Sequence, residues 1–157
     1  MKFEVYADAD SVAREAAALV AAEARAAVAS HGSFVMAVSG GHTPWLMLRN
    51  LGREGVPWNP VRVVQVDERV APAGHSDRNL THLRESLLEH ASLCPGQIHA
   101  MPVESSDLEA ASAQYALTLQ AIAASPPVLD LVHWDSGPTA TRPRTPNCQP
   151  IGQGEET

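Results

Sequence analysis

Two hydrophobic periods alternate along the first 133 residues of the chain. Short apolar runs of strand length are separated by longer segments in which apolar residues recur every three or four positions, as on one face of a helix. Asp or Ser stands near the start of several of these longer segments, where helix N-caps are favoured. The pattern predicts strands at residues 2–6, 33–39, 61–69, 98–103 and 127–133, and helices at residues 8–30, 43–51, 77–91 and 105–125.

The alternation of strands and helices predicts the fold class. The inner strands are apolar on both faces, which indicates a mainly parallel sheet covered by helices on two sides. We therefore expect an α/β, doubly wound, Rossmann-like sheet, present as a partial fold in a single domain, because 157 residues leave little room for a second domain. Sites in such sheets lie at the carboxyl ends of the strands, where loops lead into helices.

Composition narrows the classes of partner. The formal net charge of −7 argues against sequence-independent binding to nucleic acid or to an anionic membrane surface, so no nucleic acid or membrane partner is expected. No apolar run approaches a membrane span, and the cytoplasm is the expected location. Cys94 and Cys148 lie in no CxxC pattern, so neither a disulfide framework nor a metal site is predicted.

The segment Ser39-Gly40-Gly41 ends a predicted strand, and Thr43-Pro44 opens the helix that follows. Glycines let backbone N–H groups approach an anion without a Cβ in the way, and a helix start adds unpaired donors and the positive end of a dipole. Proline suits the first helical turn, where its missing donor is not needed. This layout is typical of a phosphate cradle, although a plain tight turn has the same spacing.

Asp67-Glu68-Arg69 ends the next predicted strand. If the two strands are neighbours, the Arg69 guanidinium can contact a phosphoryl group in the cradle, while Asp67 or Glu68 orients it or binds hydroxyl groups. The alternative is a solvated charge cluster. No GxSxG or HExxH motif occurs, so the spacing of residues alone identifies no proton-transfer group.

Five segments, in this order, resemble a known family: VSGGHTP, VQVDERV, HSDRNLTHLRESLL, IHAMP and LDLVH. Together they are similar to the 6-phosphogluconolactonases of the pentose phosphate pathway, in the superfamily shared with glucosamine-6-phosphate deaminases. The resemblance covers residues 1–133. The deaminases are similar at the glycine loop but typically have an aspartate-glutamate-tyrosine sequence where this chain has Asp67-Glu68-Arg69.

The resemblance implies a function and a set of site residues. The reaction is hydrolysis of 6-phospho-D-glucono-1,5-lactone, a small sugar phosphate lactone, to 6-phosphogluconate, with no cofactor and no metal. The residues that would line the substrate and phosphate site are Ser39, Gly40, Gly41, Thr43 and Arg69, with Asp67 and Asn79 in supporting positions. In the family, a histidine in a later GxGxDGHT motif activates the attacking water, which suits a neutral imidazole near pH 7.

That histidine motif has no counterpart in the chain. After LDLVH the sequence reads WDSGPTATR, and residues 134–157 are poor in aliphatic residues and rich in proline. Restoring one base after the His133 codon permits LGLGPDGHT at nine successive positions. We therefore expect residues 1–133 to be the N-terminal part of a lactonase-type α/β domain, and residues 134–157 to be a disordered tail that is read out of frame. The chain as written is then expected to have little activity, with its catalytic residue unknown.

Two alternatives stay open at this point. One is an enzyme of the glucosamine-6-phosphate deaminase or isomerase type, and the other is a non-catalytic half-domain that binds a sugar phosphate. The oligomeric state is not predictable from the sequence.

Overall fold

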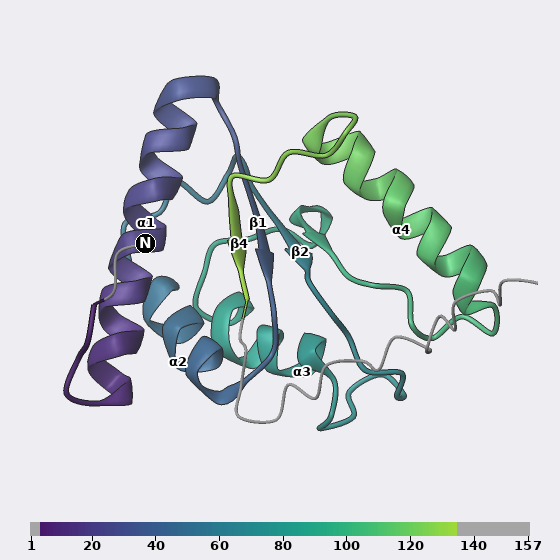
Figure 1. Ribbon diagram of the computed structural model, residues 1–157, viewed down its shortest axis with the longest axis horizontal. Coiled ribbons are helices and arrows are strands. Elements are labelled where there is room, and N and C mark those ends of the chain that lie inside the picture. Colours follow the sequence, from purple (N-terminus) through teal and green to yellow (C-terminus); the bar gives the residue numbers. More distant parts are fainter. Residues whose placement is uncertain (1–3, 135–157) are drawn as a thin grey trace, which may run out of the picture.

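A parallel sheet forms the centre of the computed structural model, which describes residues 4–134 of the chain (Figure 1). Within the described residues the sheet has four strands in the order β3-β2-β1-β4, and every pair is parallel. The strands are β1 Phe34–Val38, β2 Val61–Gln65, β3 Ile98–His99 and β4 Leu131–His133. The chain therefore moves outward from β1 to β3 and then returns to the opposite side of β1.

Helices cover both faces of the sheet. Figure 1 shows α1 and α2 on one side of the strands and α4 on the other. The helices are α1 Ala9–His31, α2 His42–Leu51, α3 Asn79–Leu83 and α4 Leu108–Ala123. A π-helical segment, Arg84–Leu88, continues α3, and a short 3-10 turn, Pro95–Gln97, precedes β3. None of the helices in the described part of the chain is long and apolar enough to cross a membrane.

The face toward α1 and α2 holds the larger core. All five residues of β1 are buried, and its alternate residues Phe34, Met36 and Val38 pack on this side. The buried stripe of α1 consists of four alanines and Val20, spaced at three and four residues, and small side chains let the helix lie close to its neighbours. Caps fix both ends of α1: the Asp8 carboxylate accepts from the Ser11 N–H at 2.7 Å, and Gly32 adopts a left-handed conformation.

On the opposite face, Tyr115 of α4 is buried against the sheet. The Tyr115 hydroxyl donates to the Gln65 carbonyl and accepts from the Gln65 N–H, both at 2.9 Å. It therefore joins α4 to the end of β2. Its apolar ring packs with Ala37 and Val64 in a second, smaller core.

The predicted α/β class and the parallel sheet with helices on both faces are confirmed. The strand predicted at residues 2–6 is wrong for its described residues, because Glu4–Tyr6 pair with no strand and Val5 is 93% exposed. Alternation is not sufficient for a strand that lacks a partner. The strand predicted at 98–103 is limited to Ile98–His99, because the chain turns at Met101, whose carbonyl accepts from the Val103 N–H. The helix predicted at 77–91 begins at Asn79 and becomes π-helical at Arg84.

Candidate functional site at the carboxyl edge of the sheet

The glycine loop lies where the strand order reverses. β1 has β2 on one side and β4 on the other, and Val38, its last residue, is in register with Gln65 and with His133. The connection after β1 runs through α2 on one face, while the chain reaches β4 through α4 on the other face. Such a reversal opens a crevice at the carboxyl ends of the strands, which is where open α/β sheets bind ligands.

The backbone conformation at position 41 requires a glycine. Its φ of 130° and ψ of 158° lie in a region that residues with a Cβ rarely adopt. This conformation turns the chain from β1 directly into α2. Gly41 is the N-cap residue of α2, so no side chain caps this helix. The N–H groups of the first turn, including those of His42 and Thr43, have no partner within an α-helix. Thr43 is exposed, while Pro44 and Ser39 are buried.

Gly40 makes room for a side chain of the protein itself. A Cβ at position 40 would stand 2.9 Å from Asn79 Nδ2 and still nearer to Oδ1 and Cγ of the same side chain. Asn79 Nδ2 also donates to the Asp67 carbonyl at 3.1 Å. The sequence-based interpretation, in which the missing Cβ of Gly40 admits an anion, is therefore corrected: Asn79 occupies that space, and it bridges the glycine loop and the Asp67-Glu68-Arg69 turn.

The carboxylate of Glu68 is completely buried and holds the start of α3. Its Oε1 accepts from the Arg69 and Asn79 N–H groups, both at 2.7 Å. Its Oε2 accepts from the Leu80 N–H and from Gln65 Nε2, both at 2.9 Å. Burial alone would raise the pKa of Glu68, but the hydrogen bonds from Gln65 and the three backbone amides hold it below its ordinary value.

Arg69 and Asp67 form an ion pair on the surface beside this turn. Arg69 Nη1 donates to Asp67 Oδ2 at 2.9 Å, and the side chain of Arg69 is 61% exposed. A guanidinium has five N–H donors, so the contact with Asp67 leaves others for a ligand. Exposed pairs of this kind add little to stability. The pair therefore orients Arg69 without contributing much to the fold.

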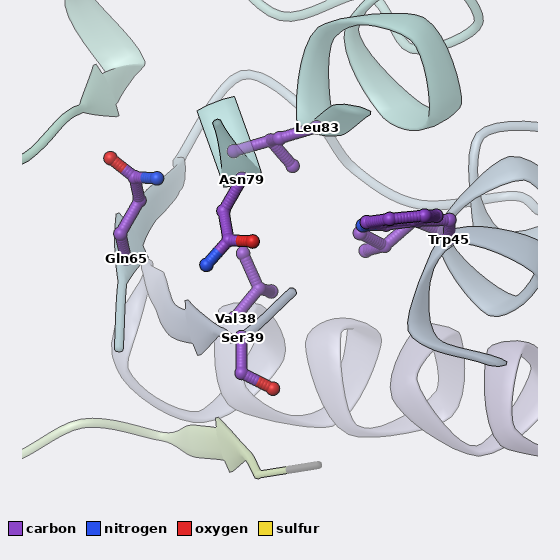
Figure 2. Close-up of a pocket in the computed structure, with 7 residues that line it drawn as sticks. Val38, Ser39, Trp45, Gln65, Asn79 and Leu83 are labelled. Carbon is purple, nitrogen blue, oxygen red and sulfur yellow. The ribbon is translucent and has the colours of Figure 1, made fainter. Parts of the chain in front are cut away.

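A small pocket lies between the glycine loop and α3. Figure 2 shows the Asn79 side chain pointing toward Val38 and Ser39, with Trp45 and Gln65 on either side of it. The indole of Trp45 stacks on the His82 ring, with 3.9 Å between the ring centroids. The residues that line the pocket are Val38, Ser39, Trp45, Leu48, Gln65, Asn79 and Leu83. Arg69 and Asp67 are not among these residues.

The structure thus brings most of the predicted site residues to one edge of the sheet. Ser39 and Asn79 line one pocket, Gly40 lies against Asn79, and Asp67 accepts from Asn79. The sequence analysis missed Trp45 and Gln65, which also line the pocket, and Arg78, which is 2% exposed beside Glu68. Gln65 could have been suspected, because it directly follows the apolar pair Val63-Val64 in a strand, and a buried glutamine needs partners for its amide.

The fold and this edge define an α/β protein with a small pocket at the switch point of a parallel sheet. Residues 7–140 match the family described as glucosamine-6-phosphate isomerases/6-phosphogluconolactonase, and the chain belongs to that family. It is 32% identical to 6-phosphogluconolactonase of Mycobacterium leprae over 127 residues, which are 77% of this chain and 51% of that protein. It is 34% identical to 6-phosphogluconolactonase of Pseudomonas putida over 152 residues, which are 95% of this chain and 61% of that protein.

A solved structure gives the same fold. The crystal structure of 6-phosphogluconolactonase from Thermotoga maritima superposes with a TM-score of 0.65 at 19% identity, covering 69% of this chain and 50% of that one. The chain thus spans about half the length of the relatives that it matches.

Proposed function

We propose that the protein carries the sugar-phosphate-binding part of a 6-phosphogluconolactonase and acts on 6-phospho-D-glucono-1,5-lactone. The supporting observation is the bridge made by Asn79, which lies against Gly40 and donates to the Asp67 carbonyl. Through it, two motifs that are 26 residues apart in sequence, Ser39-Gly40-Gly41 and Asp67-Glu68-Arg69, meet at one edge of the sheet. The curated relatives named above are all called 6-phosphogluconolactonase.

Each site residue has a chemical role in this proposal. The N–H groups of Gly40 and Gly41 and of the first turn of α2, which contains Thr43, donate to the phosphoryl oxygens, and the helix dipole favours the negative charge. The Arg69 guanidinium adds charge-assisted hydrogen bonds from the exposed side. Asp67 orients Arg69, and Ser39 and Asn79 contact the sugar side of the ligand.

Hydrolysis also needs a group that takes a proton from the attacking water. The sequence contains no aspartate-glycine-histidine motif, so no general base is assigned. Loss of a general base typically costs about 10² to 10⁴ in rate. We therefore expect the chain to bind 6-phosphogluconate and to hydrolyse the lactone slowly.

The out-of-frame interpretation of residues 134–157 stays a prediction. Residues 135–157 lie outside the described part of the structure. The match to the Pseudomonas putida protein covers 95% of the chain and so extends into this segment. Resequencing the DNA across the His133 codon decides the question. An intact reading frame without the histidine motif nearby would rule out the frameshift hypothesis.

Isothermal titration calorimetry with the 157-residue chain tests the proposed function. We expect saturable binding of 6-phosphogluconate and no measurable binding of gluconate, which lacks the phosphoryl group. Arg69→Ala should weaken the binding at least about tenfold, the loss that one charge-assisted hydrogen bond represents. Arg53→Ala, at an exposed arginine outside the site, is the matched control and should leave the affinity unchanged.

Equal binding of gluconate and 6-phosphogluconate, or an Arg69→Ala variant that binds like the parent, would refute the proposed site. Ammonia release from glucosamine-6-phosphate would instead establish the deaminase alternative. Saturable binding without any lactone hydrolysis would identify the chain as a sugar-phosphate binder.

A further inference from the structure

Glu68 forms a buried ion pair with Arg78. Glu68 Oε2 lies 3.3 Å from Arg78 Nε, and the two side chains are 0% and 3% exposed. A buried charge is costly unless it is paired and hydrogen-bonded. Glu68 accepts four hydrogen bonds, and Arg78 donates two from Nη1, while among the described residues its Nε contacts Glu68 as an ion pair without a hydrogen bond.

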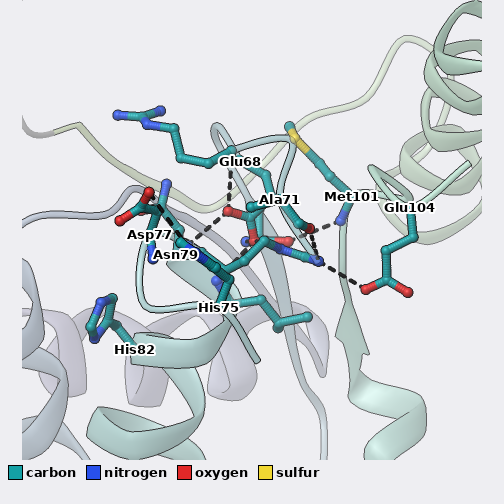
Figure 3. Close-up of polar contacts among 12 residues, drawn as sticks. Glu68, Ala71, His75, Asp77, Asn79, His82, Met101 and Glu104 are labelled. Atoms are coloured by element: carbon teal, nitrogen blue, oxygen red, sulfur yellow. Dashed lines mark hydrogen bonds and ion pairs between the residues drawn. The ribbon is translucent and has the colours of Figure 1, made fainter. Parts of the chain in front are cut away.

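Arg78 connects three segments of the chain. Its Nη1 donates to the Ala71 carbonyl at 3.0 Å and to Glu104 Oε1 at 2.8 Å. Figure 3 shows Arg78's partners Glu68, Ala71 and Glu104 arranged around one centre. Burial alone would lower the pKa of Arg78, but the hydrogen bond to Glu104 and the paired charge of Glu68 hold it above its ordinary value. The guanidinium therefore stays charged and fixes the loop between Ala71 and Arg78.

The two oxygens of Glu68 have different sets of donors. Oε2 accepts from the Leu80 N–H and Gln65 Nε2 and lies beside the Arg78 charge, whereas Oε1 accepts from the Arg69 and Asn79 N–H groups. Arg69 and Asn79 are proposed ligand-binding residues. Oε1 is therefore the atom that holds the backbone of the site.

We propose that Glu68 is a positioning residue: its carboxylate, oriented by Arg78, holds the backbones of Arg69 and Asn79 so that their side chains face the sugar phosphate. This inference rests on the proposed function for the identity of the ligand. It assigns the three residues of the Asp67-Glu68-Arg69 turn different tasks. Glu68 contacts the protein and not the ligand, while Arg69 reaches outward with Asp67 beside it.

Glu68→Gln tests the inference because a glutamine cannot satisfy both sets of donors. Its single carbonyl oxygen takes the place of Oε2, where two hydrogen bonds and the Arg78 charge converge, and its NH₂ group then faces the Arg69 and Asn79 N–H groups. The NH₂ group and the two backbone N–H groups are all donors, so no hydrogen bond can form between them. We expect hydrogen exchange at the Arg69 and Asn79 amides to accelerate at least about tenfold, the loss of one hydrogen bond to a charged group, while Leu80 keeps its protection.

The affinity for 6-phosphogluconate supplies the second measurement. At a temperature where circular dichroism shows the variant folded, Glu68→Gln should weaken binding at least about tenfold. A residue that serves stability alone would lower the melting temperature and leave the affinity of the folded protein unchanged. Glu89→Gln makes the same charge change at an exposed position and is the control.

A second variant keeps the test decisive if Glu68→Gln does not fold. Arg78→Lys retains the positive charge but cannot reach Glu68, Ala71 and Glu104 together, because an ammonium lacks the planar fork. Arg78→Met removes the charge as well. Arg78→Lys should accelerate exchange at the Arg69 and Asn79 amides relative to the parent chain, and both this acceleration and the loss of binding should be smaller than in Arg78→Met.

Unchanged exchange at Arg69 and Asn79 in a folded Glu68→Gln variant, or in both Arg78 variants, would overturn the inference. The exchange measurement needs no ligand. If the unmodified chain fails to bind 6-phosphogluconate but the variants show the expected exchange, the positioning role stands and the proposed ligand is wrong.

Discussion

Gly40→Ala is expected to destabilise the protein by forcing Asn79 out of its place. The new Cβ would stand 2.9 Å from Asn79 Nδ2 and nearer to two other atoms of that side chain, and real Cβ atoms do not approach heavy atoms so closely. If Asn79 turns away, it loses its hydrogen bond to the Asp67 carbonyl, worth about 1 kcal/mol. If it stays, overpacking costs about 1–3 kcal/mol. The loss in unfolding free energy should therefore be about 1–3 kcal/mol.

Urea denaturation followed by circular dichroism measures this loss. Gly55→Ala is the control, because a Cβ at Gly55 meets no atom within 4 Å. That change should be neutral or slightly stabilising, since it mainly restricts the unfolded chain. A double-mutant cycle with Asn79→Ala isolates the contact: the double variant should be more stable than the sum of the two single changes predicts.

Two results would refute the reasoning. If Gly40→Ala unfolds at the same urea concentration as Gly55→Ala, the space over Gly40 is not filled by Asn79. If the two substitutions are simply additive, any destabilisation by Gly40→Ala has a source other than this contact.

Two further predictions concern residues outside the site. Tyr115→Phe removes the hydroxyl that bonds both backbone groups of Gln65, which leaves a buried N–H without its acceptor and should cost about 1–3 kcal/mol in urea unfolding. Thr118→Ala on the same helix removes an exposed local bond and should change stability by less than about 0.5 kcal/mol, so equal effects would disprove the link between α4 and β2. Burial, and then the charge of Arg62, lower the pKa of His99, so the folded protein keeps the ring neutral where the unfolded chain takes up a proton. Stability should therefore fall as pH drops below about 6.5, and His99→Gln should flatten this slope while His90→Gln at an exposed position should not.

The fold was largely predictable because its elements have strong periods. The buried run of β1 and the alanine stripe of α1 are visible in the sequence, and their alternation with other helices and strands indicates a parallel sheet. The strand predicted at residues 2–6 failed because pairing depends on a partner that local alternation does not specify. The shortness of β3 has the same explanation: of the residues predicted as this strand, Ile98 and His99 pair with β2.

The site was predictable only in part. Two local features were visible in the sequence: Gly40 and Gly41 follow one predicted strand, and charged residues end the next. The use of the space over Gly40 by Asn79 is a contact between residues 39 positions apart, and the burial of Arg78 beside Glu68 depends on how a loop folds back. No local sequence pattern indicates either feature. A contact between distant residues leaves no periodicity, and a charged residue in a polar segment is ordinarily expected to be exposed. The ligand-binding roles of Ser39, Gly40, Gly41, Thr43, Asp67, Arg69 and Asn79 stay predictions.

A ¹⁵N–¹H NMR titration of the chain with 6-phosphogluconate tests the central claim most directly. If the glycine loop and Arg69 bind the phosphoryl group, the amides of Gly40, Gly41 and Thr43 and the Arg69 side-chain N–H should shift together along one saturable curve, and gluconate should leave them in place. Shifts confined to other parts of the chain, or identical shifts with gluconate, would contradict the account.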